Sequence, residues 1–105
     1  MNWEYRYWDA KNRVMYYRHH NPKPEWVEMR CAKVLDFEGK KCYDGDVLKD
    51  EQGSLHEIFF NEADEAFELL SPGAAIPTAN LNFHLFAAEC VKVGNVYENP
   101  EIWEA

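Results

Sequence analysis

The chain has 105 residues, a formal net charge of -8 and a hydrophobic content of 47%. This length suits one domain over residues 1–105, and the apolar content is enough to build a core, which excludes a disordered chain. Nineteen Asp and Glu against eleven Lys and Arg exclude a general nucleic-acid binder, because phosphate binding relies on basic side chains. An acidic surface instead suits a basic partner protein, although local basic patches remain at residues 30–33 and 38–41.

The sequence carries no signal for export or membrane insertion. The opening segment MNWEYRYWDAK lacks an apolar run, and no stretch approaches the roughly 20 apolar residues that span a bilayer. Cys31, Cys42 and Cys90 are an odd set without close spacing, which is typical of free, buried thiols in a reducing compartment. We therefore expect a cytoplasmic protein that does not bind membranes.

The N-terminal third predicts a β-hairpin followed by a longer strand. Residues 3–8 alternate, with Trp3, Tyr5 and Tyr7 on one face and Glu4 and Arg6 on the other, which predicts a half-buried strand. A turn over residues 9–13 leads to a second strand over residues 14–18. Residues 19–25 contain two prolines and interrupt the pairing, and alternation then resumes over residues 26–35.

The central third predicts turns and short strands. A turn around Gly39 precedes the expected strand position of Tyr43. Asp44 and Gly45 form a tight turn, because glycine tolerates a positive φ. A strand then starts at Val47, residues 51–54 reverse the chain, and residues 55–61 form the returning strand.

Residues 62–70 fit two structures. Their apolar positions recur at helical spacing, and they also read as a turn followed by a strand over residues 66–70. Periodicity slightly favours the helix. Residues 71–80, with two prolines and a glycine, predict a loop, and residues 81–91 predict either a strand or a short helix.

The C-terminal segment predicts a strand over residues 93–97, with a bulge or a close backbone approach at Gly94. Val93, Asn95 and Tyr97 would share one face, so Asn95 is expected to hydrogen-bond there. Asn99 before Pro100 is typical of a helix cap, and Trp103 is expected to fold back onto the body.

Three segments carry a resemblance to a known family. They are WDAKNRVMYY (Trp8–Tyr17), FEGKKCYDGDVLKDE (Phe37–Glu51) and VGNVYENPE (Val93–Glu101). In this order and spacing they resemble the YopX family, small proteins encoded mainly by phages and prophages. The segment from Asp64 to Phe83 does not follow the family pattern.

The resemblance implies a mainly β fold, a small irregular barrel-like domain of antiparallel strands with at most one or two short helices. It implies that the C-terminal motif is a core strand with a closing turn. It implies no particular enzymatic activity.

Two groups of polar residues are candidate ligand-binding positions. The first is Tyr43, Asp44 and Asp46, where paired carboxylates could bind a cation or act as acid and base. The turn chemistry of Asp44 and Asp46 favours a structural role over this one. The second group contains Asn95, Tyr97, Glu98 and Asn99, where capping is again favoured over ligand binding. The two groups would meet if their strands are neighbours.

The sequence contains no complete metal-ligand set, nucleophile-base pair or phosphate-binding loop, so we expect no catalytic residue, metal or cofactor. The first hypothesis is a non-catalytic phage or prophage accessory protein of unknown role that binds a host or phage protein. The alternative is a small-ligand or nucleotide-binding module, and a carboxylate-based hydrolase ranks third. Homo-oligomers are compatible with edge strands and exposed aromatic side chains.

Overall fold

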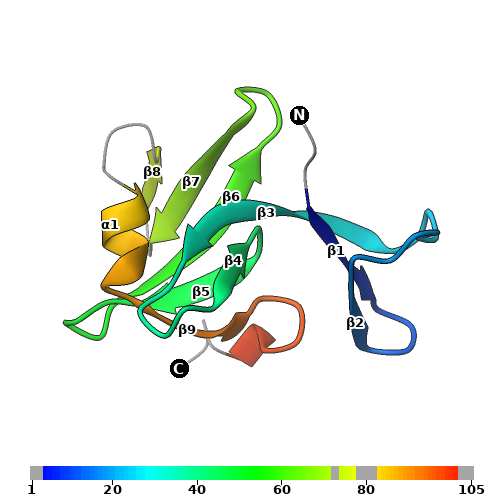
Figure 1. Ribbon diagram of the computed structural model, residues 1–105, viewed down its shortest axis with the longest axis horizontal. Helices are drawn as coiled ribbons and strands as arrows, with labels where there is room; N and C mark the ends of the chain where they lie inside the picture. Colours follow the sequence, from blue (N-terminus) through cyan, green and yellow to red (C-terminus); the bar gives the residue numbers. More distant parts are fainter. Residues whose placement is uncertain (1–3, 72–73, 78–82, 102–105) are drawn as a thin grey trace.

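The computed structural model describes residues 4–71, 74–77 and 83–101. As the sequence predicts, the fold is mainly antiparallel β-structure with one short helix among the described residues (Figure 1). The elements are β1 (Tyr5–Asp9), β2 (Val14–Tyr17), β3 (Val27–Leu35), β4 (Lys41–Tyr43), β5 (Asp46–Lys49), β6 (Leu55–Asn61), β7 (Ala66–Ser71), β8 (Ala74–Pro77), α1 (Phe83–Ala88) and β9 (Val91–Asn95).

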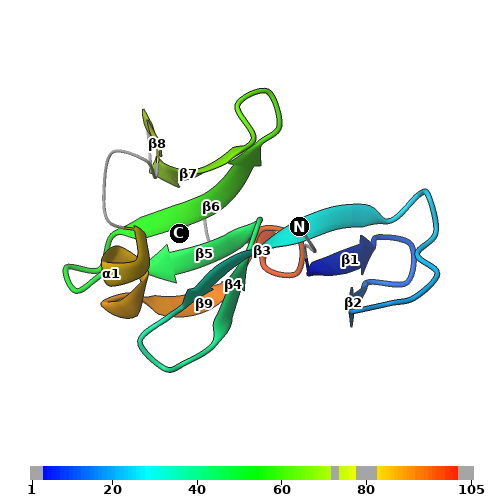
Figure 2. The same ribbon diagram turned by 45° about the horizontal axis from the view of Figure 1, so that its top comes forward.

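The strands form two sheets. One has four strands in the order β2-β1-β3-β4, and the other has five in the order β8-β7-β6-β5-β9. Figures 1 and 2 both show the β1–β2 hairpin at one end of the molecule and α1 at the opposite end, with β3 running between them. No helix in the described ranges is long and apolar enough to cross a membrane.

The β1–β2 hairpin forms as predicted. Tyr7 pairs with Tyr16 in its register. The Asp9 carboxylate fixes the turn, because it accepts hydrogen bonds from the Asn12 backbone N–H at 3.2 Å and from the Asn12 side-chain amide at 2.8 Å. Arg13 closes the turn in the left-handed region, at φ 54°.

The predicted turn at Asp44 and Gly45 carries the chain from one sheet to the other. The Asp44 N–H donates to the Arg30 carbonyl in β3 at 2.9 Å, whereas the Gly45 N–H donates to the Ile58 carbonyl in β6 at 2.7 Å. Gly45 has φ 93°, and a Cβ there would lie 3.1 Å from the Tyr97 ring. Both conditions favour glycine at this position.

The core lies between the five-stranded sheet, the inner half of β3, β4 and α1. It buries a cluster of small and branched side chains, namely Val34, Cys42, Leu48, Ile58, Leu69, Ala87 and Cys90, and Phe83 and Phe86 from α1 pack against it. Cys31, Cys42 and Cys90 are free and buried, as expected.

The helix favoured for residues 62–70 is wrong, and the alternative turn and strand is correct. The Asn61 side chain accepts hydrogen bonds from the N–H groups of Ala63 and Asp64 at 3.0 and 3.4 Å, and Glu65 adopts φ 49°. These features close a hairpin, and β7 then pairs with β6 so that the rings of Phe60 and Phe67 meet at 5.0 Å. Cross-strand pairing therefore outweighs the helical spacing of the apolar residues.

Two other boundaries differ from the predictions, and one open alternative is decided. Part of the expected loop over residues 71–80 is the edge strand β8, which ends on Pro77, where an edge tolerates proline. Residues 83–88 take the helical alternative. The strand expected over residues 93–97 ends at Asn95, whose side chain accepts the Tyr97 and Glu98 N–H groups and so begins a turn. The bulge expected at Gly94 is present and leaves Val93 42% exposed.

Candidate functional site at the junction of the two sheets

A polar pocket of about 250 Å³ lies where β1, β5 and β9 meet. Four of the sequence-predicted residues share it: Asp46, Asn95, Glu98 and Asn99. They come together because Asp46 in β5 is the register partner of Asn95 in β9. The remaining lining residues are Arg6, Tyr17, Lys40, Lys92, Val93 and Gly94.

A buried ion pair forms the floor of this pocket. Arg6 Nη2 lies 2.8 Å from Asp46 Oδ1, and the two side chains are each 1% exposed. Arg6 also donates to the Asp44 carbonyl at 3.2 Å, and its guanidinium lies 4.8 Å from the centre of the Tyr43 ring. The half-buried strand predicted for residues 3–8 is therefore wrong at Arg6, because Asp46 of the second sheet lies against the face that carries this side chain.

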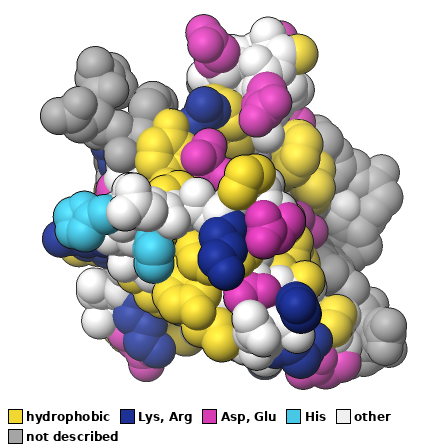
Figure 3. Space-filling model, turned by 90° about the vertical axis from the view of Figure 1, so that its right-hand side faces the viewer, with side chains coloured by type: hydrophobic (Ala, Val, Ile, Leu, Met, Phe, Trp, Pro, Cys, Tyr) yellow, Lys and Arg dark blue, Asp and Glu magenta, His cyan; other side chains and the backbone are white. Residues whose placement is uncertain are grey.

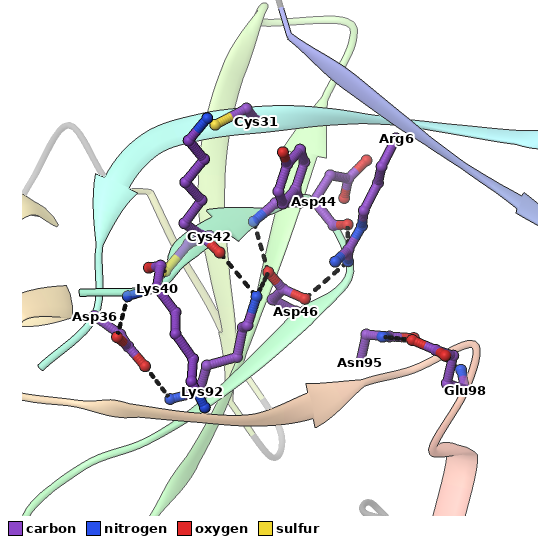
Figure 4. A network of polar contacts seen from close by, with 12 residues as sticks. Arg6, Cys31, Asp36, Lys40, Cys42, Asp44, Asp46, Lys92, Asn95 and Glu98 are labelled. Atoms are coloured by element: carbon purple, nitrogen blue, oxygen red, sulfur yellow. Dashed lines mark hydrogen bonds and ion pairs between the residues drawn. The ribbon is translucent and has the colours of Figure 1, made fainter. Parts of the chain in front are cut away.

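Lys92 reaches Asp46 from the side opposite Arg6, as Figure 4 shows. Its Nζ lies 3.5 Å from Asp46 Oδ2 and donates to the Lys41 carbonyl at 2.8 Å. The Tyr43 N–H donates to the same Asp46 oxygen at 2.7 Å. Burial raises the pKa of Asp46, and Arg6 and Lys92 act in the opposite direction by favouring its charged form.

Two buried polar atoms in this pair are incompletely satisfied within the described residues. Arg6 Nε has no hydrogen-bond partner there, and the contact of Asp46 Oδ1 is the 2.8 Å ion pair with Arg6. Because both atoms are closed off from solvent, their incomplete hydrogen bonding adds to the cost of burying the pair.

The C-terminal motif forms an Asx turn beside the ion pair. Asn95 Oδ1 accepts hydrogen bonds from the Tyr97 and Glu98 N–H groups at 3.0 and 2.8 Å, and Asn95 Nδ2 donates to Glu98 Oε1 at 2.8 Å. The predicted hydrogen bonding of Asn95 is confirmed. Asn99 accepts from the Asn95 N–H at 3.3 Å, and a 3₁₀ turn begins at Pro100. Tyr97 is half-buried, and Trp103 lies outside the described residues.

The other three predicted residues point elsewhere. Tyr43 is buried, and its hydroxyl donates to Glu4. Tyr97 packs against Trp8, with ring centres 6.5 Å apart. Asp44 accepts the Phe60 N–H at 3.2 Å and lines a separate pocket of about 360 Å³. Asp44 and Asp46 thus do not face a common space, as a catalytic carboxylate pair would have to.

Asp36 is a further buried carboxylate, and it was not predicted from the sequence. It accepts the Glu38 and Lys40 N–H groups at 2.9 and 2.8 Å, and that of Lys92 at 2.8 Å, which ties its turn to β9. Burial alone would raise the pKa of Asp36, but these three backbone donors outweigh it and lower the pKa.

Glu4 forms ion pairs with basic side chains on the outer side of the junction. It accepts the Tyr43 hydroxyl and the Lys41 ammonium, the latter at 3.0 Å, and it pairs with Arg18 at 3.2 Å. These partners, Tyr43 first, lower the pKa of Glu4 to about 2. The carboxylate therefore links β1, β4 and the end of β2.

A family model described as YopX protein matches residues 27–104. The chain belongs to the YopX family. A comparison with curated proteins found no match. The YopX match begins with β3 and includes Asp46, Lys92 and the Asx turn, whereas β1 and β2, with Arg6 and the segment Trp8–Tyr17, precede it.

The hairpin that precedes the matched region carries a group of aromatic side chains. We call Tyr5, Tyr7, Tyr16, His19 and Trp26 the aromatic face. Tyr16 stacks on Trp26 with ring centres 4.6 Å apart and planes at 15°, and His19 meets both rings edge-on. Tyr7 is buried, His19 is exposed, and the other three are half-buried.

The hairpin end of the molecule is also basic, which was not predicted from the sequence. Residues 10–23 contain Lys11, Arg13, Arg18 and Lys23 and no Asp or Glu, whereas residues 50–91 contain eight Asp and Glu and no Lys or Arg. Figure 3 faces the hairpin end and shows hydrophobic, His and Lys or Arg side chains side by side, with acidic ones among them. A count of charge by segment reveals the asymmetry that the total of -8 conceals.

Proposed function

We propose that this YopX family protein is a non-catalytic accessory protein of a phage or prophage that acts by binding a protein partner. The observation that carries the proposal is the aromatic face at the free end of the hairpin. Trp, Tyr and Arg side chains dominate the binding energy of protein interfaces, and half-exposed examples at one end of a fold suit such a contact.

The arrangement of the aromatic face supports this function because its rings are held in place before any partner arrives. Tyr16 and Trp26 stack on each other, and Tyr7 contacts Trp26 at 6.4 Å between ring centres. Lys23 lies 6.0 Å from the centre of the Trp26 ring. Side chains that are already ordered lose little conformational entropy on binding.

The two aspartates of the Tyr43–Asp46 segment support a non-catalytic role. Asp46 pairs with Arg6 and Lys92 in a buried network, and Asp44 accepts the Phe60 N–H beside another pocket. Each carboxylate thus has a structural task of its own. This division of tasks disfavours the carboxylate-based hydrolase.

The test is a capture experiment with matched variants. The tagged protein, a Tyr16→Ala/Trp26→Ala variant and a Phe37→Ala variant are each used to capture proteins from the encoding host during phage growth. Phe37 is 72% exposed and lies outside the aromatic face, so it controls for general stickiness. We expect a reproducible partner with the wild type and Phe37→Ala that is lost with the double variant.

Thermal melts of the variants separate lost contact from lost folding, because Tyr16 and Trp26 are half-buried. The proposal fails if a folded double variant captures the same partner as the wild type. It also fails if no stage of phage growth yields a reproducible partner.

A second candidate function rests on the polar pocket beside the Arg6–Asp46 pair. A small polar ligand, such as a nucleotide or another anionic metabolite, could enter the 250 Å³ pocket and pair with Lys92, which lines it and is 19% exposed. A thermal-shift panel of nucleotides and metabolites tests it, with Lys92→Met as the matched variant. A stabilising ligand whose effect Lys92→Met abolishes supports this function, and a flat panel removes it.

A further inference from the structure

The outer edge of β2 is a row of backbone groups without a strand partner among the described residues. β2 stands at the end of the four-stranded sheet. The Arg18 N–H donates to the Tyr5 carbonyl at 3.2 Å, so residues 14, 16 and 18 turn their backbone groups toward β1. By alternation, the N–H and C=O groups of Met15 and Tyr17 point away from the sheet.

The side chains at this edge offer contacts on both faces of the sheet. Tyr16 lies on the aromatic face, and Tyr17, which is 53% exposed, lies on the opposite face. A strand laid beside β2 would therefore place alternate side chains against aromatic rings on either side.

Arginines mark both ends of this short edge. Arg13 directly precedes β2 and Arg18 directly follows it, both in the left-handed region at φ 54° and 56°. Arg18 is 68% exposed and pairs with Glu4, and Arg13 lies over the Trp8 ring. An exposed ion pair contributes little to stability, so Arg18 can share or exchange its partner.

We propose that an extended acidic segment of the partner protein adds to β2 as a new edge strand of the four-stranded sheet. This inference rests on the proposed function and names the chemistry of its partner. The backbone groups of Met15 and Tyr17 supply the ladder, and Arg13 and Arg18 receive carboxylates about five residues apart in the added strand, as the rise of a strand requires.

Two other occupants fit the edge less well. A nucleic acid would match the basic charge but has no peptide groups to pair with Met15 and Tyr17. A second copy that paired its own β2 with this one would set arginines near arginines, and such like-charged contacts disfavour pairing. An acidic segment satisfies both the backbone edge and the charge.

The probe is the peptide Glu-Thr-Val-Thr-Val-Glu, titrated into the full chain and followed through its backbone amide NMR signals and their hydrogen exchange. We expect the amides of Met15 and Tyr17 to shift and to become protected from exchange, and those of the 95–99 turn to stay unchanged. A peptide with Lys in place of both Glu residues, and one with both Glu residues at the same end, are the controls.

Variants separate the backbone contribution from the charge contribution. Arg13→Glu should weaken binding about tenfold or more, because it replaces attraction by repulsion. Met15→Pro removes the N–H of Met15, which points away from β1 and pairs with no group of that strand. Proline is tolerated at such an edge position, so the fold should persist while the peptide no longer protects the Tyr17 amide. Lys33→Glu, on β3, makes the same charge change away from the edge and should leave the affinity unchanged.

Several outcomes overturn the inference. The inference is wrong if millimolar peptide shifts no amide signal of β2, or if the lysine peptide binds as tightly as the glutamate peptide. It is also wrong if single-stranded DNA binds this edge more tightly than the peptide, or if sedimentation shows that the chain self-associates and Met15→Pro abolishes that association. If the capture experiment yields a partner that depends on Tyr16 and Trp26 while these titrations fail, the proposed function stands and strand addition alone is wrong.

Discussion

Arg6 and Asp46 form a buried ion pair, with 2.8 Å between Nη2 and Oδ1, that joins β1 of one sheet to β5 of the other. The two residues are far apart in the sequence and lie in different sheets, so their contact fixes how the sheets meet. The polar pocket, the Asx turn and the crossing at Gly45 all adjoin this contact.

Removal of one partner of the pair should destabilise the fold strongly. Arg6→Met leaves the Asp46 carboxylate buried with only Lys92 beside it, and we expect a loss of about 3 kcal/mol in the free energy of unfolding. Asp46→Asn should cost a similar amount. Urea denaturation of both variants measures these losses.

The double variant Arg6→Met/Asp46→Asn should cost clearly less than the sum of the two single changes, because no unpaired charge remains in the interior. Strictly additive losses, or single losses below about 1 kcal/mol, would show that the pair does not organise the junction.

Glu4 predicts a specific loss of stability in acid. Its pKa falls from 4.5 in the unfolded chain to about 2 in the fold. The stabilisation is therefore fully present above pH 4.5 and is lost as the pH falls toward 2. Because the side chain is 24% exposed, solvent screening reduces the effect, and we expect about 1–2 kcal/mol.

Stability curves of the wild type and Glu4→Gln between pH 6 and 2 test this expectation. The difference between them should shrink as the pH falls through the 4.5 to 2 window. Glu25→Gln, at an exposed position, is the control and should run parallel to the wild type. A constant difference for Glu4→Gln would mean that its ion pairs do not stabilise the fold.

Gly45 and Gly39 form a matched pair for the crossing between the sheets. Both have positive φ, 93° and 80°, but a Cβ at Gly45 would lie 3.1 Å from the Tyr97 ring, whereas a Cβ at Gly39 would have nothing within 4 Å. Gly39→Ala should cost about 1 kcal/mol from backbone strain alone. Gly45→Ala should cost about 2–3 kcal/mol, because the ring must also move.

Comparison of the denaturation midpoints of Gly39→Ala and Gly45→Ala tests whether Tyr97 packs against Gly45. Equal losses would indicate that Tyr97 does not pack against Gly45, and the C-terminal turn would then not seal this junction.

The cysteines should be unreactive in the folded protein. All three are buried, and burial raises the pKa of Cys42 to about 12 and that of Cys90 to about 11. Because the thiolate is the reactive form, we expect no labelling by a thiol reagent at pH 8 in buffer and three labels in denaturant. Rapid native labelling of Cys42 would place it outside the core.

Local patterns in the sequence predict the hairpin, the strand over residues 55–61 and the turn at Gly45, because these depend on neighbouring residues. The structure of residues 62–70 could not be decided in this way, since the spacing of their apolar residues fits both a helix and a strand and slightly favours the helix, which is wrong. Only the pairing of β7 with β6 selects the strand.

In the candidate site, too, the residues with a local turn signal were predicted, and those that depend on distant contacts were not. Asp46 and Asn95 were identified from their turn chemistry, and their neighbouring strands bring them together. Arg6 and Lys92 were not identified, because their roles depend on contacts with distant parts of the chain. Alternation predicts a half-buried strand with Arg6 on the face opposite Tyr5 and Tyr7, and only the position of the second sheet reveals that Arg6 is buried as well.

The central claim is that the protein meets its partner through the hairpin end, and hydrogen exchange of the protein with and without the captured partner tests it most directly. We predict slower exchange confined to β2 and the residues around Trp26, with the amides of Met15 and Tyr17 most protected. Protection centred instead on the turn at residues 95–99 would contradict the claim and move the functional site to the Arg6–Asp46 pocket.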